Sequence, residues 1–247
     1  MPRLDAEVPM PDGACRVTVH LPDGEGPWPG VVMIPDAGGP RETLRRMADR
    51  LAGLGYVVLL PDIYYRSGPW APFDVATLFT DDAERARMGG YARELTDDRI
   101  VADARAWADA LLARPETAGT AIGTTGYCLG GRMSLIVATG LGERVAAAAS
   151  FHGGRLAVAD DPASPHRAVD RITARVYVAG AEQDTSFTPE QAALLGAALT
   201  AAGVDHTLEI YPARHGFAVA DNPTYDADAA ARHWSALADL YAATLPR

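Results

Sequence analysis

Continuous apolar runs alternate with segments of helical spacing along most of the chain. The runs are typical of strands buried on both faces of a sheet, and they predict strands at residues 30–35, 56–60, 122–126, 144–151, 174–179 and 207–211. Apolar positions three and four residues apart predict helices at 41–54, 97–114, 132–139, 188–202 and 225–243. Residues 15–21 alternate apolar and polar side chains and predict an early, exposed strand. Strands and helices in this order predict an α/β fold, a mostly parallel, doubly wound sheet of about seven or eight strands with helices on both faces.

Residues 64–95 break this alternation. Residues 64–79 carry five aromatic side chains without clean periodicity, and a predicted helix follows over residues 85–95. We expect this segment to leave the sheet and pass over one edge as a partial lid. No internal repeat or low-complexity linker interrupts the chain, so we expect residues 1–247 to form a single domain.

The net charge and the cysteine content limit the classes of binding partner and the cellular compartment that we expect. The net charge of −10 argues against nucleic acid or an anionic membrane surface, because both attract clustered Lys and Arg. Two cysteines give no disulfide framework, which favours the reducing cytoplasm. The N-terminal residues have no apolar stretch typical of a signal peptide, and no run is long enough for a membrane span. We expect a cytoplasmic monomer or homodimer that acts on a small molecule.

A cysteine lies between two glycines where a predicted strand passes into a helix. The sequence Gly126-Tyr127-Cys128-Leu129-Gly130 is the cysteine form of the G-x-S-x-G nucleophile elbow. Such a sharp turn needs small neighbours, and glycine lacks the β-carbon that would clash there. The amides at the start of the helix favour a thiolate and the oxyanion that forms when it attacks a carbonyl. Cys128 is therefore the candidate nucleophile, although a cysteine in such a pattern is commonly an inert small hydrophobe.

A thiol nucleophile needs a base, and the base needs an orienting acid. Cys128, Asp184 and His215 each follow a predicted strand, which places them on the rim where parallel sheets bind ligands. Their order along the chain is the nucleophile, acid, histidine order of hydrolases with this type of elbow. His152 also follows a strand and is the rival base, but we expect it to line the pocket; Glu182 is the rival acid. Histidine suits a proton relay, and a carboxylate fixes its tautomer.

Two backbone amides are candidates for an oxyanion hole. One is the N–H of Leu129, directly after the nucleophile, and the other belongs to Ala37, in the loop after the strand at residues 30–35. The small residues at 37–39 would let a substrate carbonyl approach that backbone.

Five motifs span most of the chain: Gly-Val-Val-Met-Ile-Pro-Asp (30–36), Gly-Tyr-Val-Val-Leu-Leu-Pro-Asp-Ile-Tyr-Tyr-Arg (55–66), Gly-Tyr-Cys-Leu-Gly-Gly-Arg (126–132), Gly-Ala-Glu-Gln-Asp (180–184) and Ala-Arg-His-Gly-Phe (213–217). On these motifs the chain resembles, from about residue 15 to 243, the dienelactone hydrolase (carboxymethylenebutenolidase) family. The resemblance implies an α/β-hydrolase fold and a triad of Cys128, His215 and Asp184. It also implies hydrolysis of a lactone or small ester through a thioester, with no cofactor and no metal.

Two positions depart from the family pattern. Asp36 stands where the family has a glutamate that helps to ionise the thiol, so it is the candidate thiol-activating acid. Arg85 matches the first of two arginines that grip a substrate carboxylate in the family, but Val219 occupies the place of the second. The missing second arginine affects the expected substrate more than the reaction type, whereas Asp36, one methylene shorter than glutamate, affects the expected proton route. The other residues expected to bind substrate are Tyr64, His152 and Phe217.

Two other functions remain open from the sequence. Cys128 would also serve a thiol-redox enzyme, although the second cysteine, Cys15, lies far away along the chain. A hydrolase fold that kept the pocket and lost the chemistry would bind a ligand without turning it over.

Overall fold

A computed structural model describes residues 1–245. Within these residues eight strands join in a single sheet with the order β1-β2-β4-β3-β5-β6-β7-β8, in which β2 pairs antiparallel with both β1 and β4, and β3 to β8 pair in parallel. The strands are β1 (Arg3–Met10), β2 (Gly13–His20), β3 (Trp28–Ile34), β4 (Val57–Pro61), β5 (Thr117–Tyr127), β6 (Val145–Phe151), β7 (Arg175–Gln183) and β8 (His206–Arg214).

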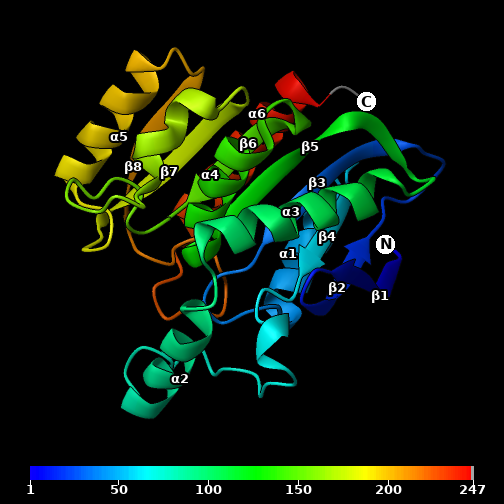
Figure 1. Ribbon diagram of the computed structural model, residues 1–247, viewed down its shortest axis with the longest axis horizontal. Coiled ribbons are helices and arrows are strands. Elements are labelled where there is room, and N and C mark those ends of the chain that lie inside the picture. The colour runs from blue at the N-terminus through cyan, green and yellow to red at the C-terminus, as the bar shows by residue number, and fades with distance from the viewer. Residues whose placement is uncertain (246–247) are drawn as a thin grey trace.

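Helices cover both faces of this sheet (Figure 1). They are α1 (Glu42–Ala52), α2 (Asp82–Ala92), α3 (Asp97–Leu112), α4 (Leu129–Leu141), α5 (Pro189–Ala201) and α6 (Ala227–Thr244). The apolar sides of α1 and α6 belong to one core cluster, and those of α3, α4 and α5 belong to the other. Alternate residues of β3 face the two clusters, Val31 and Met33 on one side and Val32 and Ile34 on the other, as expected for a strand buried on both faces. The predicted α/β-hydrolase architecture is therefore observed.

The first strand is the largest departure from the predicted elements. β1 pairs with β2 over its whole length, yet only Val8 and Met10 of its eight residues are buried. An edge strand with so little buried surface carries almost no apolar pattern. Residues 165–171 also form a short 3₁₀ helix.

Residues 64–95 leave the sheet as expected. The α2 helix stands off the body of the molecule, beyond the edge of the sheet where the carboxyl ends of the strands lie (Figure 1). It has no buried residue, which distinguishes it from the other α-helices. Its polarity is consistent with a segment held at one side rather than packed in a layer. Within residues 1–245, no helix combines the length and apolar character that crossing a membrane requires.

Candidate active site

The backbone around Cys128 is strained and depends on glycine on both sides. Cys128 has φ +53°, a conformation that residues with a side chain rarely adopt. A β-carbon on Gly126 would lie 1.9 Å from the carbonyl oxygen of Gly130, and one on Gly130 would lie 2.4 Å from that of Ile34. The turn between β5 and α4 is therefore open only to glycine at these two positions. It presents the half-buried thiol at the first turn of α4, whose first residue is Leu129.

The backbone N–H of Cys128 points away from the helix and is held by its neighbours. It donates to the Phe151 carbonyl oxygen and to Nδ1 of His152, each at 3.1 Å. Because Nδ1 accepts, the neutral His152 ring carries its proton on Nε2. Burial, with the neighbouring His215 second, lowers the pKa of His152 well below its ordinary value, so this ring stays neutral. His152 therefore supports the turn that displays the Cys128 thiol.

Asp184 and His215 meet at the ends of β7 and β8. His215 Nδ1 donates to Asp184 Oδ2 at 2.7 Å, while both the N–H and the hydroxyl of Ser186 donate to Asp184 Oδ1, each at 2.7 Å. Burial alone would raise the pKa of Asp184, but these bonds hold it below its ordinary value. Glu182, the rival acid, is exposed on β7. The structure thus pairs His215 with Asp184 rather than with Glu182.

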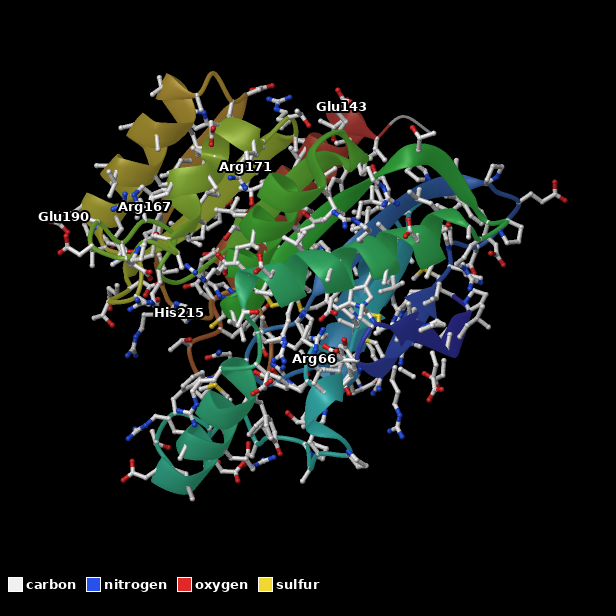
Figure 2. All side chains as sticks on the ribbon, in the orientation of Figure 1. Arg66, Glu143, Arg167, Arg171, Glu190 and His215 are labelled. Carbon is white, nitrogen blue, oxygen red and sulfur yellow. The ribbon has the colours of Figure 1, made fainter. Side chains whose placement is uncertain are left out.

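His215 also interacts with the sulfur of Cys128. The ring lies at the rim of the sheet that faces α2 (Figures 1 and 2), and with Nδ1 committed to Asp184, its Nε2 is left for the sulfur. Burial opposes protonation of the ring, but the sulfur charge and the Asp184 carboxylate outweigh it and raise the pKa of His215 to about 10. The His215 ring therefore lies between the Cys128 sulfur and the Asp184 carboxylate.

This raised pKa predicts how the His215 ring titrates. We expect its NMR signals to remain those of an imidazolium at pH 8 and to titrate near pH 10. The ring's contribution to stability is then complete below about pH 6.5, its unfolded value, and is lost as pH rises through about 10. In Cys128→Ala the His215 pKa should fall, because the largest favourable contribution is gone.

His166 provides the internal control for that titration. Burial and the nearby Arg167 lower its pKa, so it should titrate below 6.5 in the same spectra. A His215 signal that titrates near 6.5 in the wild type, or one that does not respond to Cys128→Ala, would show that sulfur and imidazole do not interact.

The loop that follows β3 is held by an arginine. Both carboxylate oxygens of Asp36 accept from Arg41, at 2.7 and 2.9 Å, and Oδ1 also accepts from the N–H of Gly38 at 2.9 Å. Asp36 is only 6% exposed. The acid expected to ionise the thiol is therefore engaged by a guanidinium in this structure. Its visible effect is to shape the turn that carries Ala37, which is buried beside it.

Three of the four residues expected to bind substrate are buried among protein groups. Tyr64, His152 and Phe217 are each no more than 1% exposed. The Tyr64 hydroxyl donates to the Ala37 carbonyl oxygen at 2.9 Å, and the Phe217 ring packs on the His152 ring with centroids 5.0 Å apart. As placed here, these side chains support the loops around the thiol rather than present free polar atoms to a substrate.

The fourth residue, Arg85, is exposed on α2 and already paired. Its guanidinium donates to Asp82 one turn earlier at 2.6 Å, and half of the side chain is open to solvent. Arg87, two residues later, faces inward instead: it lies 3.9 Å over the ring of Phe73 and pairs with Glu84. The sequence predicts this helix but not its rotation, so the resemblance selected the outer of two arginines.

Trp70 and Val75 fix the predicted lid segment to the loop that carries Ala37. A β-carbon on Gly39 would lie 2.6 Å from the Trp70 ring, and one on Gly38 would lie 2.7 Å from Val75. The Trp70 indole donates to Asp62 at 3.0 Å and packs edge-on against Tyr64. The segment therefore packs on the small residues of this loop.

Three residues at the site escaped the sequence analysis. Ser186 had a signal, since Asp-x-Ser is a common hydrogen-bonded turn. Arg41 and Asp221, which pair across the site, had none that local sequence provides. Among residues 1–245, no group of three or more His, Cys, Asp or Glu side chains is placed to hold a metal ion.

Comparison with known proteins identifies the family. The profile of the dienelactone hydrolase family matches residues 15–245. The chain belongs to the dienelactone hydrolase family. A Synechocystis protein provisionally named a carboxymethylenebutenolidase is 28% identical over 95% of this chain and 94% of its own length.

Solved structures of the dienelactone hydrolase type have the same fold. The dienelactone hydrolase-like promiscuous phosphotriesterase P91, from metagenomic libraries, is 28% identical, covers 99% of this chain and 100% of its own, and superposes with a TM-score of 0.79. A dienelactone hydrolase from Anabaena variabilis is 18% identical and covers 99% of this chain and 98% of its own, with a TM-score of 0.67. At that identity the second comparison speaks for the fold alone.

Proposed function

We propose that this dienelactone hydrolase family member hydrolyses a small carboxylic ester or lactone through a thioester on Cys128. The observation that carries the proposal is the contact of His215 with both the Cys128 sulfur and the Asp184 carboxylate, at a strained turn that opens onto a helix N-terminus. A buried structural cysteine needs neither a histidine poised over it nor a backbone strained to expose it.

The reaction follows from these positions. The thiolate attacks the substrate carbonyl, and the N–H groups of Leu129 and Ala37 receive the developing oxyanion. His215 gives its proton to the leaving alkoxide as the C–O bond breaks, which leaves a thioester and a neutral imidazole held by Asp184. The imidazole then takes a proton from water as that water attacks the thioester. Collapse of the resulting tetrahedral intermediate breaks the C–S bond, which releases the carboxylic acid and returns the charge to sulfur, while His215 keeps the proton that it took from water.

Asp36 is not needed for this proton route. Its two oxygens are held by Arg41, and His215 is placed to take the Cys128 proton directly. The role expected from the family glutamate is thus replaced, in our proposal, by support of the loop that carries Ala37.

The charges around the site favour a neutral substrate. Arg85 is neutralised by Asp82, and the place of the second family arginine holds Val219, which is fully buried. A carboxylate-bearing lactone would find no free guanidinium at either position. P91, whose name describes action on phosphotriesters, adds neutral triesters to the compounds to assay.

A redox function has less support. Cys15 is fully buried in β2, and burial raises its pKa to about 12, so its thiol is a poor candidate to resolve an oxidised Cys128. We further propose that the protein works in the cytoplasm, as a monomer or homodimer, since a reducing compartment keeps a catalytic thiol active.

Turnover by the purified protein tests this function. The substrates are p-nitrophenyl acetate, a neutral six-membered lactone, the same lactone bearing a carboxylate, and a neutral p-nitrophenyl phosphotriester. We expect many turnovers of the acetate and the neutral lactone, with kcat/KM for the neutral lactone at least about tenfold above that of its charged analogue, the effect of about 1.4 kcal/mol. The matched control is the same protein after alkylation with iodoacetamide, which should be inactive.

Two results would contradict the proposal separately. A folded protein with a titratable thiol that turns over no ester or lactone would remove the hydrolase function. Preference for the charged lactone would leave the hydrolase function and remove the neutral substrate class.

A further inference from the structure

Arg41 bridges two carboxylates that lie 185 residues apart in the chain. It immediately precedes α1, and its side chain is 13% exposed. Nη1 and Nη2 donate to the two oxygens of Asp36, while Nε and Nη2 donate to the two oxygens of Asp221, each at 2.7 Å. Nη1 also reaches the Gly39 carbonyl oxygen at 3.2 Å. The planar guanidinium of Arg41 thus donates to one carboxylate along each of two edges, which a lysine ammonium cannot do.

The two carboxylates belong to the two loops that the reaction must bring together. Asp36 begins the turn that carries the Ala37 amide, with Gly39 N–H closing onto the Asp36 carbonyl oxygen at 2.9 Å. Asp221 lies in the loop between β8 and α6, six residues after His215. An arginine that holds both carboxylates fixes the distance between the two loops.

The histidine loop is stiff enough to transmit this restraint. Asn222 N–H donates to the Val219 carbonyl oxygen at 2.9 Å, and Thr224 contacts both Asn222 and the carbonyl oxygen of His215 through its hydroxyl. Asp221 is joined by a peptide bond to Asn222, whose side chain connects through the Thr224 hydroxyl to the His215 backbone. A movement of the Arg41 guanidinium would therefore displace the His215 imidazole.

The ion pairs are placed to persist. Burial alone would raise the pKa of Asp221, but Arg41 holds it below its ordinary value. Asp36 and Arg41 are largely shielded from water, so salt screens their attraction less than it screens exposed pairs.

We propose that Arg41 is a positioning residue that keeps the Ala37 amide and the His215 imidazole aligned on one substrate carbonyl. This inference rests on the proposed ester hydrolysis, but it concerns a residue that touches neither substrate nor sulfur. It assigns to Asp36 a partner and a purpose different from thiol ionisation. Loss of the bridge should lower the rate of the chemical step more than substrate affinity.

The test replaces Arg41 by lysine and compares it with Arg45→Lys. Lysine keeps the charge but cannot bridge two carboxylates in plane. Arg45 is the matched control because it lies one turn further on, its Nε contacts Thr18 at 3.5 Å, and it lines a separate cavity of about 970 Å³ among β1, β2 and the Trp70 loop. For Arg41→Lys we expect kcat to fall by about 10- to 100-fold with KM within threefold of wild type. Arg45→Lys should retain both values.

A second variant and a second readout keep the test decisive. Asp221→Asn preserves shape and removes one anchor, so it should lose kcat less than Arg41→Lys, and the double variant should be no worse than Arg41→Lys alone. The His215 NMR signals should shift or broaden in Arg41→Lys and stay unchanged in Arg45→Lys. This signal reports on the bridge even if the wild type hydrolyses none of the esters tested.

The outcomes separate clearly. Arg41→Lys with wild-type kcat and an unchanged His215 spectrum, whether or not its thermal stability falls, would overturn the positioning role. An inactive wild type whose His215 spectrum still depends on Arg41 would retain the bridge and remove the proposed hydrolysis.

Discussion

Cys128→Ala should lose ester hydrolysis almost completely, with kcat reduced by about 10⁴-fold or more. Without the sulfur no thioester forms, so water must attack the substrate carbonyl directly. Only the amides of Leu129 and Ala37, which we propose stabilise the oxyanion, would then assist. The half-buried sulfur leaves space when it is removed, so the fold should persist. The measurement is steady-state release of p-nitrophenol by wild type and variant at equal concentration of folded protein.

Two controls surround that result. Cys15→Ala removes the other thiol, which is buried in β2 and donates to the Asp62 carbonyl oxygen, and it should leave kcat unchanged at a cost in stability only. Cys128→Ser keeps the shape of the nucleophile, but a hydroxyl is far less acidic than a thiol, so its rate should also fall strongly. Rates for Cys128→Ala within about tenfold of wild type would place the chemistry elsewhere.

Asp184→Asn should lower kcat by about 10⁴-fold, the size of effect seen when the acid of a serine protease triad is changed to its amide. The asparagine side chain would offer an N–H to His215 Nδ1, where the carboxylate accepts one, and would turn the ring to the wrong tautomer. The proton would then lie on the nitrogen that must receive it from the thiol. Loss of the carboxylate also removes one of the causes that raise the His215 pKa, which should drop in the same NMR titration.

Glu182→Gln is the matched control for that variant. It makes the same chemical change two residues earlier on β7, at an exposed position. We expect wild-type kinetics from it. If instead Glu182→Gln lost activity and Asp184→Asn kept it, the acid of the relay would have been misassigned.

The rim of the sheet is the part of this site that the sequence could predict. Continuous apolar runs predict buried parallel strands, and the carboxyl ends of such strands lie along one edge of the sheet. Residues directly after such runs therefore meet, and the pairing of His215 with Asp184 across 31 positions is an example. The exposed edge strand β1 gave no such signal, because only Val8 and Met10 on it report a buried face.

The ion-pair partners of the charged side chains could not be predicted from the sequence. The residues next to Arg41 in the sequence do not indicate that its two carboxylate partners come from the loops after β3 and β8. These contacts depend on how the two loops fold back toward each other. Likewise, Arg85 and Arg87 are the same residue type two positions apart on one predicted helix. Only the rotation of α2 about its axis places Arg85 in water and Arg87 over the Phe73 ring. Such choices follow from packing, which a pattern of polar and apolar residues specifies only by face.

The most direct test of the account is to look for the acyl group on sulfur during the first turnover. The wild type is mixed with the p-nitrophenyl ester of a bulky acid, whose thioester should be hydrolysed slowly, then quenched in acid and digested for mass spectrometry. We predict a burst of p-nitrophenol equal to the protein present and an acyl group on the peptide that contains Cys128, absent in Cys128→Ala. Steady ester cleavage with that peptide unmodified at every quench time, or with the acyl group on another residue, would contradict a thioester mechanism.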